Sequence, residues 1–255
     1  MSNLKAFSMD NIKELRTPDG SYFLFDAELI DEPAEDLFCA SHWKAQGKLI
    51  GSASGRGSTH LIQNDHAGYA LRHYLRGGLI RHFNKDRYLW TSLESTRAWQ
   101  EFHVLFLLFN EGLPSPQPVA AHVRRHGFSY QADIITALIK DSNTLASLLK
   151  HKKLDKTTWK NIGKTIRLFH DKGLDHADLN AHNILFDKNN KIYVIDFDRA
   201  VIRADIGRWK QNNLNRLLRS LKKLASQNED FHFSENEWSS FLSGYQGQTS
   251  THQRQ

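Results

Sequence analysis

The stretch LDHADLNAHNILFD, residues 174–187, gathers carboxylates, amides and imidazoles between small and apolar residues. Asn183 follows Asp178 after five positions, and Asp196 comes eighteen positions after Asp178, in YVIDFDRA. A loop and a neighbouring hairpin can bring these three side chains into one cleft. Carboxylate and amide oxygens suit Mg²⁺, which usually completes its coordination with water and substrate phosphates. A remaining carboxylate can then act as the base in a phosphoryl transfer.

Two other interpretations of this stretch need weighing. Asp and Asn side chains often cap local backbone groups in ordinary turns, and for any one of these residues that is the commoner role. The combined spacing of the three residues argues against a plain turn. A zinc site built from His176 and His182 is the weaker competitor, because nothing nearby in the sequence completes a typical ligand set.

The elements around this stretch are predicted to be helical, apart from one hairpin. DSNTLASLLK predicts a turn followed by a short helix. LDKTTWKNIGKTIRLFHDKG has apolar residues at helical spacing, with Asp155 as a plausible cap and Gly173 as the stop. NILF and KIYVI, separated by the polar turn DKNN, predict a small hairpin whose second strand leads to Asp196.

The N-terminal half is predicted to be rich in strands, although its first 50 residues carry no clear pattern. LIGSASGRGSTHLIQ predicts two short strands around a glycine-rich turn, and GYALRHYLRGGLI predicts another strand that runs into a turn at Gly77–Gly78. TSLESTRAWQEFHVLFLLFNEG predicts a long helix that starts with a capping box at Thr91 and Glu94 and stops at Gly112. FSYQADIITALI predicts a largely buried strand.

The bulk properties limit the functional classes without choosing one. The chain has 255 residues, a net charge of +6 and a pI near 9.3, which favours an anionic partner such as nucleic acid, a phosphorylated substrate or an acidic membrane. We find no nucleic-acid readout motif. The single cysteine, Cys39, excludes an internal disulfide framework and favours a reducing compartment. The longest apolar run, VLFLLF at 104–109, is too short to cross a bilayer, and no signal peptide is evident.

The segments HADLNAHN and DFD resemble the catalytic loop and the metal-binding motif of the protein-kinase-like superfamily. The resemblance implies an α+β, bilobal fold, with a β-rich nucleotide-binding N-lobe over residues 1–140 and a mainly helical C-lobe over 141–255. It implies ATP and Mg²⁺ as cofactors, Asp178 as catalytic base, Asn183 and Asp196 as metal ligands, and His176 packed behind the loop. Alanine at 177 and the lack of an A-P-E motif favour a small-molecule kinase over a protein kinase regulated through its activation loop.

The same resemblance assigns nucleotide-binding residues in the N-terminal half. Gly51, Gly55 and Gly57 would let backbone N–H groups approach phosphate oxygens, although a bare hairpin turn is the alternative. Arg72 takes the place of the usual kinase lysine, and its partner would be Glu101 on the long helix. A solvated helix charge is the alternative for Glu101.

Further segments narrow the resemblance to the lipopolysaccharide kinases of Gram-negative bacteria: LRHYLRGGLI, TRAWQEFHVL, GLPSPQPVAA and HADLNAHNIL. It spans residues from about 50 to about 225. It implies phosphorylation of the 4-hydroxyl of 3-deoxy-D-manno-octulosonic acid (Kdo) on a lipid A precursor, at the cytoplasmic face of the inner membrane. The enzyme would be peripheral to the membrane and would not bind nucleic acid. A heptose kinase or an antibiotic phosphotransferase would use the same base and metal ligands. A pseudokinase that uses its basic helix to dock on membranes or on partner proteins is disfavoured by the intact Asp178, Asn183 and Asp196 set.

A basic segment near the C-terminus offers a contact for such an acceptor. In RAVIRADIGRWKQNNLNRLLRSLKK, five leucines form a stripe that is expected to be core. Arg216, Arg219 and Lys223 are expected on the opposite, solvated face, where they could meet lipid A phosphate, sugar carboxylate or anionic headgroups. Arg76 and Arg81 are further candidates for acceptor or phosphate contacts.

Overall fold

The computed structural model describes residues 11–53, 59–64, 67–76, 86–204 and 207–247. The candidate residues Gly55, Gly57 and Arg81, and the turn predicted at Gly77–Gly78, lie outside these ranges. The chain divides into two compact units. Unit 1 comprises the described residues up to Gly112 together with Pro116–Ile139, and unit 2 comprises Leu113–Ser115 and the described residues from Lys140 onward.

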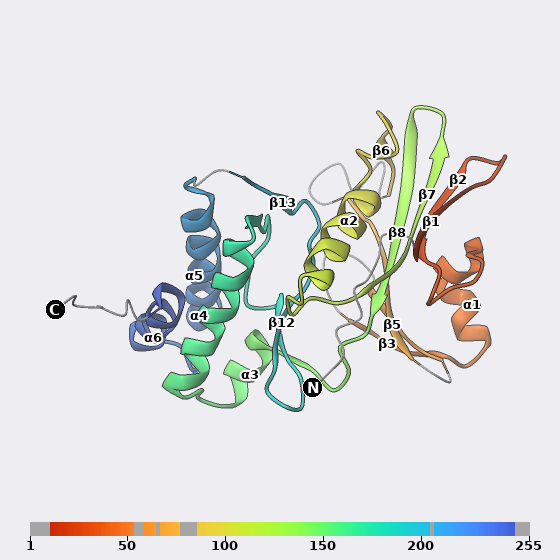
Figure 1. Cartoon of the computed structure of the whole chain (residues 1–255). Helices are drawn as coiled ribbons and strands as arrows, with labels where there is room; N and C mark the ends of the chain where they lie inside the picture. Colours follow the sequence, from red (N-terminus) through yellow and green to blue (C-terminus); the bar gives the residue numbers. More distant parts are fainter. Residues whose placement is uncertain (1–10, 54–58, 65–66, 77–85, 205–206, 248–255) are drawn as a thin grey trace, which may run out of the picture. The chain divides into compact units, whose positions relative to one another are not determined.

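Unit 1 is built on one antiparallel sheet (Figure 1), with strands in the order β1-β2-β7-β8-β5-β4-β3 and β6 paired with β8. Short turns connect β1 to β2 and β7 to β8. Along each strand, successive side chains point to opposite faces of the sheet. The elements are β1 (Ile12–Arg16), β2 (Ser21–Asp26), the 3-10 helix η2 (Glu35–Phe38), α1 (Ala40–Ala45), β3 (Leu49–Ala53), β4 (Thr59–Gln63), β5 (Gly68–His73), β6 (Tyr88–Leu89), α2 (Arg97–Asn110), β7 (Pro118–His126) and β8 (Ser129–Ala137).

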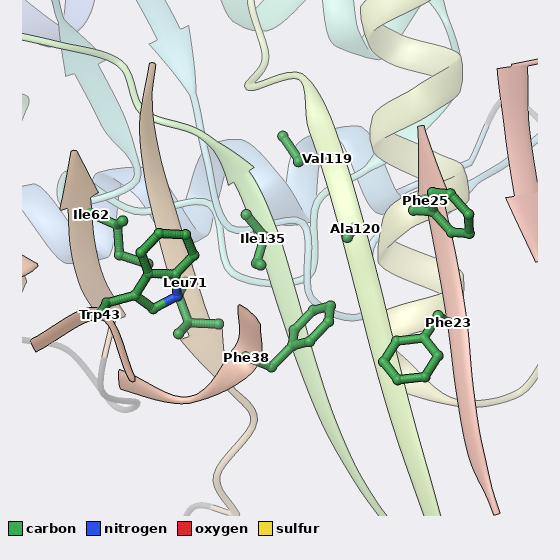
Figure 2. Packing of buried hydrophobic residues seen from close by; sticks show 9 residues of the cluster. All are labelled: Phe23, Phe25, Phe38, Trp43, Ile62, Leu71, Val119, Ala120 and Ile135. Atoms are coloured by element: carbon green, nitrogen blue, oxygen red, sulfur yellow. The ribbon is translucent and has the colours of Figure 1, made fainter. Parts of the chain in front are cut away.

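The two faces of this sheet carry different helices: α2 lies along β7 and β8 on one face, and η2 with α1 lies on the other (Figure 1). Figure 2 shows the apolar cluster beneath η2 and α1. Paired residues of four strands, Phe25, Ala120, Ile135 and Leu71, form a row across it. Burial of this row and of Phe38 supplies the hydrophobic free energy that holds η2 on the sheet.

The start of the long helix is the one place in this unit where the sequence prediction is wrong. Helix α2 begins at Arg97, with Thr96 at the N-cap position, and not at a capping box formed by Thr91 and Glu94. Thr91 pairs its hydroxyl with that of Ser95 at 2.6 Å, and the Thr96 hydroxyl donates to the Leu93 carbonyl at 2.6 Å. These local bonds close a separate turn before the helix, as Ser and Thr side chains often do.

Unit 2 is mainly helical and holds two small antiparallel sheets. Asp155 caps α4 by accepting a hydrogen bond from the Thr158 N–H at 2.6 Å, as predicted. The predicted hairpin is formed by β11 and β12. The elements are β9 (Asn143–Thr144), α3 (Leu145–His151), α4 (Lys156–Asp171), β10 (Leu174–Asp175), β11 (Ile184–Phe186), β12 (Ile192–Val194), β13 (Val201–Ile202), α5 (Trp209–Gln227) and α6 (Glu235–Gln246).

Helices α4 and α6 approach each other backbone to backbone. A Cβ atom added to Gly163 on α4 would lie 2.1 Å from the Phe241 carbonyl oxygen. One added to Gly244 on α6 would lie 2.0 Å from the Lys160 carbonyl oxygen. Only glycine fits at both positions, so these two residues set the spacing of the helix pair.

The fold class is therefore confirmed as α+β, with a β-rich N-terminal part and helices towards the C-terminus. The strands and helices predicted from residue 49 to residue 194 are present. The first 50 residues, which carried no clear signal, contribute β1, β2, η2 and α1. Their side chains form much of the core in Figure 2, including Phe23, Phe25 and Trp43.

Candidate active site

The loop between β10 and β11 holds His176, Asp178 and Asn183, and His176 is its buried support. The Asp178 N–H donates to His176 Nδ1 at 3.1 Å, so Nδ1 carries no proton. His176 Nε2 must then carry the proton, and it donates to the Ile195 carbonyl at 3.1 Å. Burial lowers the pKa of His176, which keeps the ring neutral and this tautomer in place. With both ring nitrogens engaged, His176 has no lone pair left for zinc.

Asn183 ties the far end of the loop back to Asp178. Its Nδ2 donates to the Asp178 carbonyl at 2.9 Å, and its own backbone carbonyl accepts from the Ile195 N–H at 3.0 Å. The first bond determines which way the amide is turned, so Oδ1 is the atom presented as an oxygen ligand. The Asn183 side chain thus holds the Asp178 carbonyl, and the Asn183 backbone is itself held by Ile195.

Asp196 lies two residues beyond β12, in the segment that passes behind the loop. Its backbone has a φ of +63°, a region that non-glycine residues rarely adopt and that is often found at functional positions. The next residue, Phe197, is buried and packs its ring 5.2 Å from that of His176. Asp196 is therefore held by a buried aromatic neighbour that also contacts the support of the loop.

Three polar residues of α5 form hydrogen bonds to the loop: Asn213, Arg216 and Ser220. The sequence analysis did not predict this role. Asn213 Oδ1 accepts from the His176 N–H at 2.8 Å, and its Nδ2 donates to Asp175 Oδ1 at 2.8 Å. Ser220 Oγ accepts from the Ala181 N–H at 3.2 Å. The available signal in the sequence was an asparagine beside the leucine stripe of an otherwise charged helix. In the structure its side chain is buried, 1% exposed.

The expectation for the basic face of α5 is wrong at one position. Arg216 is half-buried and donates to the His176 carbonyl at 3.4 Å, so it belongs to the support of the loop and not to the solvated face. The position is one helical turn from Asn213, which places both side chains towards the loop. Arg219 and Lys223 are exposed, as expected, and Leu214, Leu217 and Leu221 are core residues.

In unit 1, the expected pairing of Arg72 with Glu101 is present. Arg72 on β5 forms an ion pair with Glu101 on α2, whose side chain is only 3% exposed. Tyr74 completes the group: its hydroxyl donates to Glu101 Oε2 at 2.6 Å, and its ring lies 4.7 Å from the Arg72 guanidinium carbon. Burial raises the pKa of Tyr74, with the Glu101 charge adding to the effect. Glu101 is therefore a buried anchor and not a solvated helix charge.

Two other sequence candidates in unit 1 have ordinary surroundings. Gly51 lies in β3, at an irregularity in the pairing of β3 with β4, and a Cβ atom there would meet only Leu61 Cδ1, at 4.0 Å. Arg76 is half-buried, with its guanidinium carbon 5.2 Å from the centre of the Tyr88 ring. Their roles in binding nucleotide or acceptor stay predictions.

The donor set in unit 2 fits magnesium and not a transition metal. Within the described residues, no group of three or more His, Cys, Asp or Glu side chains is placed to hold a metal ion. Mg²⁺ does not need such a cage, because it is bound by one or two protein oxygens and completes its shell with water and phosphate. Asn183 Oδ1 and the Asp196 carboxylate are oxygens of this kind.

The β-rich first unit and the mainly helical second unit, with HADLNAHN carried between β10 and β11, are those of a bilobal kinase-like fold. The family model described as "Lipopolysaccharide kinase (Kdo/WaaP) family" matches residues 40–245. The chain belongs to this family.

Several relatives share most of their length with the chain, and each is named 3-deoxy-D-manno-octulosonic acid kinase. The protein of Vibrio parahaemolyticus is 45% identical over 199 residues, which is 78% of this chain and 83% of that protein. A Haemophilus influenzae protein is 42% identical over 236 residues, covering 89% and 97%. The Photobacterium profundum protein is 40% identical over 228 residues, covering 89% and 96%.

Proposed function

We propose that the chain is an ATP-dependent sugar kinase that transfers the γ-phosphoryl group of ATP to the 4-hydroxyl of Kdo in a Kdo–lipid A precursor. The family membership and the names of the relatives support a kinase for Kdo in the biosynthesis of the lipopolysaccharide core. The observation that carries the chemistry is the ordered loop in which a neutral, buried His176 and Asn183 both bond the backbone of Asp178.

Asp178 is the residue that we assign to proton transfer. In the reaction, the acceptor hydroxyl oxygen forms a bond to the γ-phosphorus, the bond from that phosphorus to the leaving ADP oxygen breaks, and the hydroxyl proton passes to the Asp178 carboxylate. Such a reaction requires mainly positioning and charge neutralisation. The bonds from His176 and Asn183 supply positioning, because they leave little freedom to the backbone that carries the carboxylate.

Arg72 and Glu101 are the residues that we assign to the nucleotide in unit 1. The Glu101 carboxylate and the Tyr74 hydroxyl orient the guanidinium, and its planar fork suits two phosphate oxygens at once. Asn183 and Asp196 would hold Mg²⁺, which when bound neutralises charge on the phosphates. Gly51, with Gly55 and Gly57, remains the proposed phosphate-binding loop.

We further propose that the enzyme acts at the cytoplasmic face of the inner membrane as a peripheral protein, because its acceptor is anchored there by lipid. Across the described ranges, no helix combines the length and the apolar character needed to cross a bilayer. The positive net charge agrees with an acceptor that carries a carboxylate and phosphates.

The test is phosphate transfer from labelled ATP with three acceptors compared side by side: the Kdo–lipid A precursor, the same lipid carrying heptose, and lipid A precursor without Kdo. We expect transfer of labelled phosphate to the first acceptor. NMR spectra of the product should then show the new phosphate on the 4-oxygen of Kdo. Transfer that requires heptose, or that persists without Kdo, would contradict the proposed acceptor. Asp178→Asn serves as the inactive control for contaminating kinases.

A further inference from the structure

One end of unit 1 exposes apolar side chains that its own core does not use. Phe128, in the turn between β7 and β8, is 88% exposed, and Leu89, in β6, is 70% exposed. They lie at the same end of the sheet, because Leu89 pairs with Ser129, next to the turn, and the Trp90 N–H donates to the Phe128 carbonyl at 2.9 Å. Figure 1 shows β6 beside the end of the β7–β8 hairpin. Phe128, Leu89 and Trp90 are called the hairpin tip below.

The turn itself is built to project Phe128. His126 pairs with Ser129, so Gly127 and Phe128 form a two-residue loop. Gly127 has a φ of +59° and Phe128 does not have a positive φ, which is the pattern of a type II′ turn with glycine first. The tight turn gives Phe128 no neighbour to fold back on, and its side chain is left in solvent.

Aromatic and basic residues support the tip. The Trp90 ring lies 5.7 Å from that of Tyr22 in a stacked arrangement and 6.2 Å from that of Tyr130 in an edge arrangement. The Arg125 guanidinium carbon lies 4.8 Å from the Trp90 ring. Arg87, next to β6, is exposed. Arg125 also donates from Nε to the Gly127 carbonyl at 3.1 Å. No carboxylate of the described residues pairs with Arg87 or with Arg125, so both guanidinium groups can meet acidic headgroups.

We propose that the hairpin tip is the surface by which the enzyme inserts into the headgroup region of an anionic bilayer. The shape and composition of the hairpin tip favour a bilayer over a protein as its partner. Phe128 on its turn and Leu89 on β6 together offer far less than the area of about 800 Å² that each partner buries in a stable protein interface. Exposed apolar side chains backed by Trp, Tyr and arginine are instead the composition of surfaces that lie at a membrane interface. The arginines complement acidic headgroups.

The other basic surface, on α5, lacks the apolar component. Its leucines at 214, 217 and 221 are buried, Arg216 bonds the catalytic loop, and Lys222 pairs with Glu235 at 2.6 Å. The charges that remain there can attract a membrane but have nothing to insert. The tip therefore replaces α5 as the expected insertion site. The inference takes its biological setting from the proposed function, but vesicle binding needs neither acceptor nor nucleotide.

The first experiment measures co-sedimentation of the full chain with phosphatidylglycerol–phosphatidylethanolamine vesicles. Phe128→Ser combined with Leu89→Ser should weaken binding about tenfold or more, because both side chains leave water on insertion. Leu168→Ser, which replaces a side chain 54% exposed on α4, is the matched control and should stay within about twofold of the parent. Equal binding by the double variant and the parent, or no binding by the parent, would overturn the proposal.

The second experiment tests charge and depth. Arg87→Gln should weaken binding to anionic vesicles about fivefold and leave binding to neutral vesicles unchanged, whereas Arg219→Gln on α5 should have little effect. With the single native cysteine replaced in Cys39→Ser, Phe128→Cys labelled with an environment-sensitive fluorophore should shift to the blue on vesicles. The same label at Leu107→Cys should not shift. The proposal is contradicted if Arg219→Gln weakens vesicle binding more than Arg87→Gln does. It is also contradicted if the fluorophore at position 107 shifts to the blue and the one at position 128 does not.

A third measurement separates this proposal from the proposed function. The tip variants should keep the parent's activity on a soluble, delipidated acceptor and lose activity on the acceptor in vesicles. If the parent binds vesicles through the tip but transfers no phosphate to any Kdo acceptor, the proposed function fails and the tip stands. If the tip variants lose both activities equally, the tip supports the fold and the membrane proposal fails.

Discussion

At the scale of single residues, the loop between β10 and β11 holds the residue that we propose as base, Asp178, through the side chains of its neighbours. Asp178 is held through its backbone: its N–H is bound by His176 and its carbonyl by Asn183. The carboxylate itself stays half-buried and is the group that can meet an acceptor. A substitution of the carboxylate should therefore change the rate of phosphate transfer but not the affinity for ATP.

Asp178→Asn should lower kcat by about 10²–10⁴, the usual contribution of a general base, because an amide cannot accept the hydroxyl proton. The dissociation constant for ATP should change by no more than about twofold, since the proposed base acts on the acceptor hydroxyl and not on the nucleotide. Steady-state kinetics with calorimetric titration of ATP would check both values. Near-normal turnover would remove Asp178 from the role of base.

Glu101→Gln tests the buried pair in unit 1. Hydrogen bonds to a charged group contribute about 1.5–3 kcal/mol, and the variant leaves Arg72 and Tyr74 without the carboxylate that they share. We expect a loss of stability of that order in denaturant unfolding and weaker ATP binding in calorimetric titration, because the guanidinium loses its orientation. Glu94→Gln, at an exposed site before α2, should change neither. A variant with full stability and parental ATP affinity would contradict the anchoring role.

At the scale of secondary structure, helix α5 supports the loop and α6 sets the position of α4. The contacts of α5 come from Asn213, Arg216 and Ser220, which recur at the spacing of one helix face. Below the loop, this face mixes hydrogen-bonding groups with the leucines that pack into the core.

Asn213→Ala should lower kcat more than it raises the KM for ATP, because it releases the His176 N–H and the Asp175 carboxylate behind the reacting group. The cost in stability should be about 1–3 kcal/mol for leaving buried partners unsatisfied. Asn212→Ala, on the exposed side of the same helix, is the matched control. Equal loss in both variants would point to a general effect on the helix. If Asn213→Ala kept the parent's kcat, the positioning role would be wrong.

Gly163→Ala should destabilise unit 2 by more than about 2 kcal/mol, because the new methyl group would overlap the Phe241 carbonyl and push α6 away from α4. Gly51→Ala is the control for a glycine whose surroundings have room, with the nearest atom 4.0 Å away. Thermal unfolding of the two variants would show the contrast. A midpoint for Gly163→Ala equal to that of the parent would mean that the helices are not in backbone contact.

At the scale of the whole molecule, buried histidines make stability depend on pH. His170 on α4 is 1% exposed, and its Nδ1 lies 2.7 Å from the Tyr245 hydroxyl. Burial lowers the pKa of His170 from 6.5 to about 4. The unfolded chain therefore binds a proton that the folded chain does not, and stability falls as the pH drops below 6.5. Burial of His176 acts in the same direction.

His170→Gln should flatten this dependence. Between about pH 7.5 and about pH 5, a histidine with this shift costs about 2 kcal/mol of unfolding free energy, and a glutamine at the same site costs nothing. His73 acts with the opposite sign, because its hydrogen bond to Asp133 raises its pKa, and that stability is lost as the pH rises through the folded value. Urea unfolding at both pH values would measure the difference, with exposed His151→Gln as control. An unchanged slope would contradict the assignment.

Local residue patterns were sufficient to predict much of the secondary structure and the candidate site of this protein. The Asp155 cap, the hairpin around DKNN and the strands β3, β4, β5 and β8 depend on neighbours within a few positions, so a short window contains the information. The residue types and spacing of Asp178, Asn183 and Asp196 indicated magnesium-dependent phosphoryl transfer, and the resemblance of HADLNAHN and DFD to kinase motifs implied the kinase-like class. The bonds of the Asp178 and Asn183 backbones show how that spacing becomes a loop.

Other features depend on segments far apart in the chain, and no local pattern contains them. Arg216 looked like one more solvated arginine until the loop 40 residues earlier in the chain was placed against α5. The start of α2 depended on hydroxyl bonds that compete with the expected cap. Phe23, Phe25 and Trp43 found their core only through strand pairing and the packing of η2 on the sheet. Phe128 is exposed because no other segment of the fold packs against its turn. Whether a side chain is buried depends on the segments that the fold brings near it, and a local pattern does not contain that information.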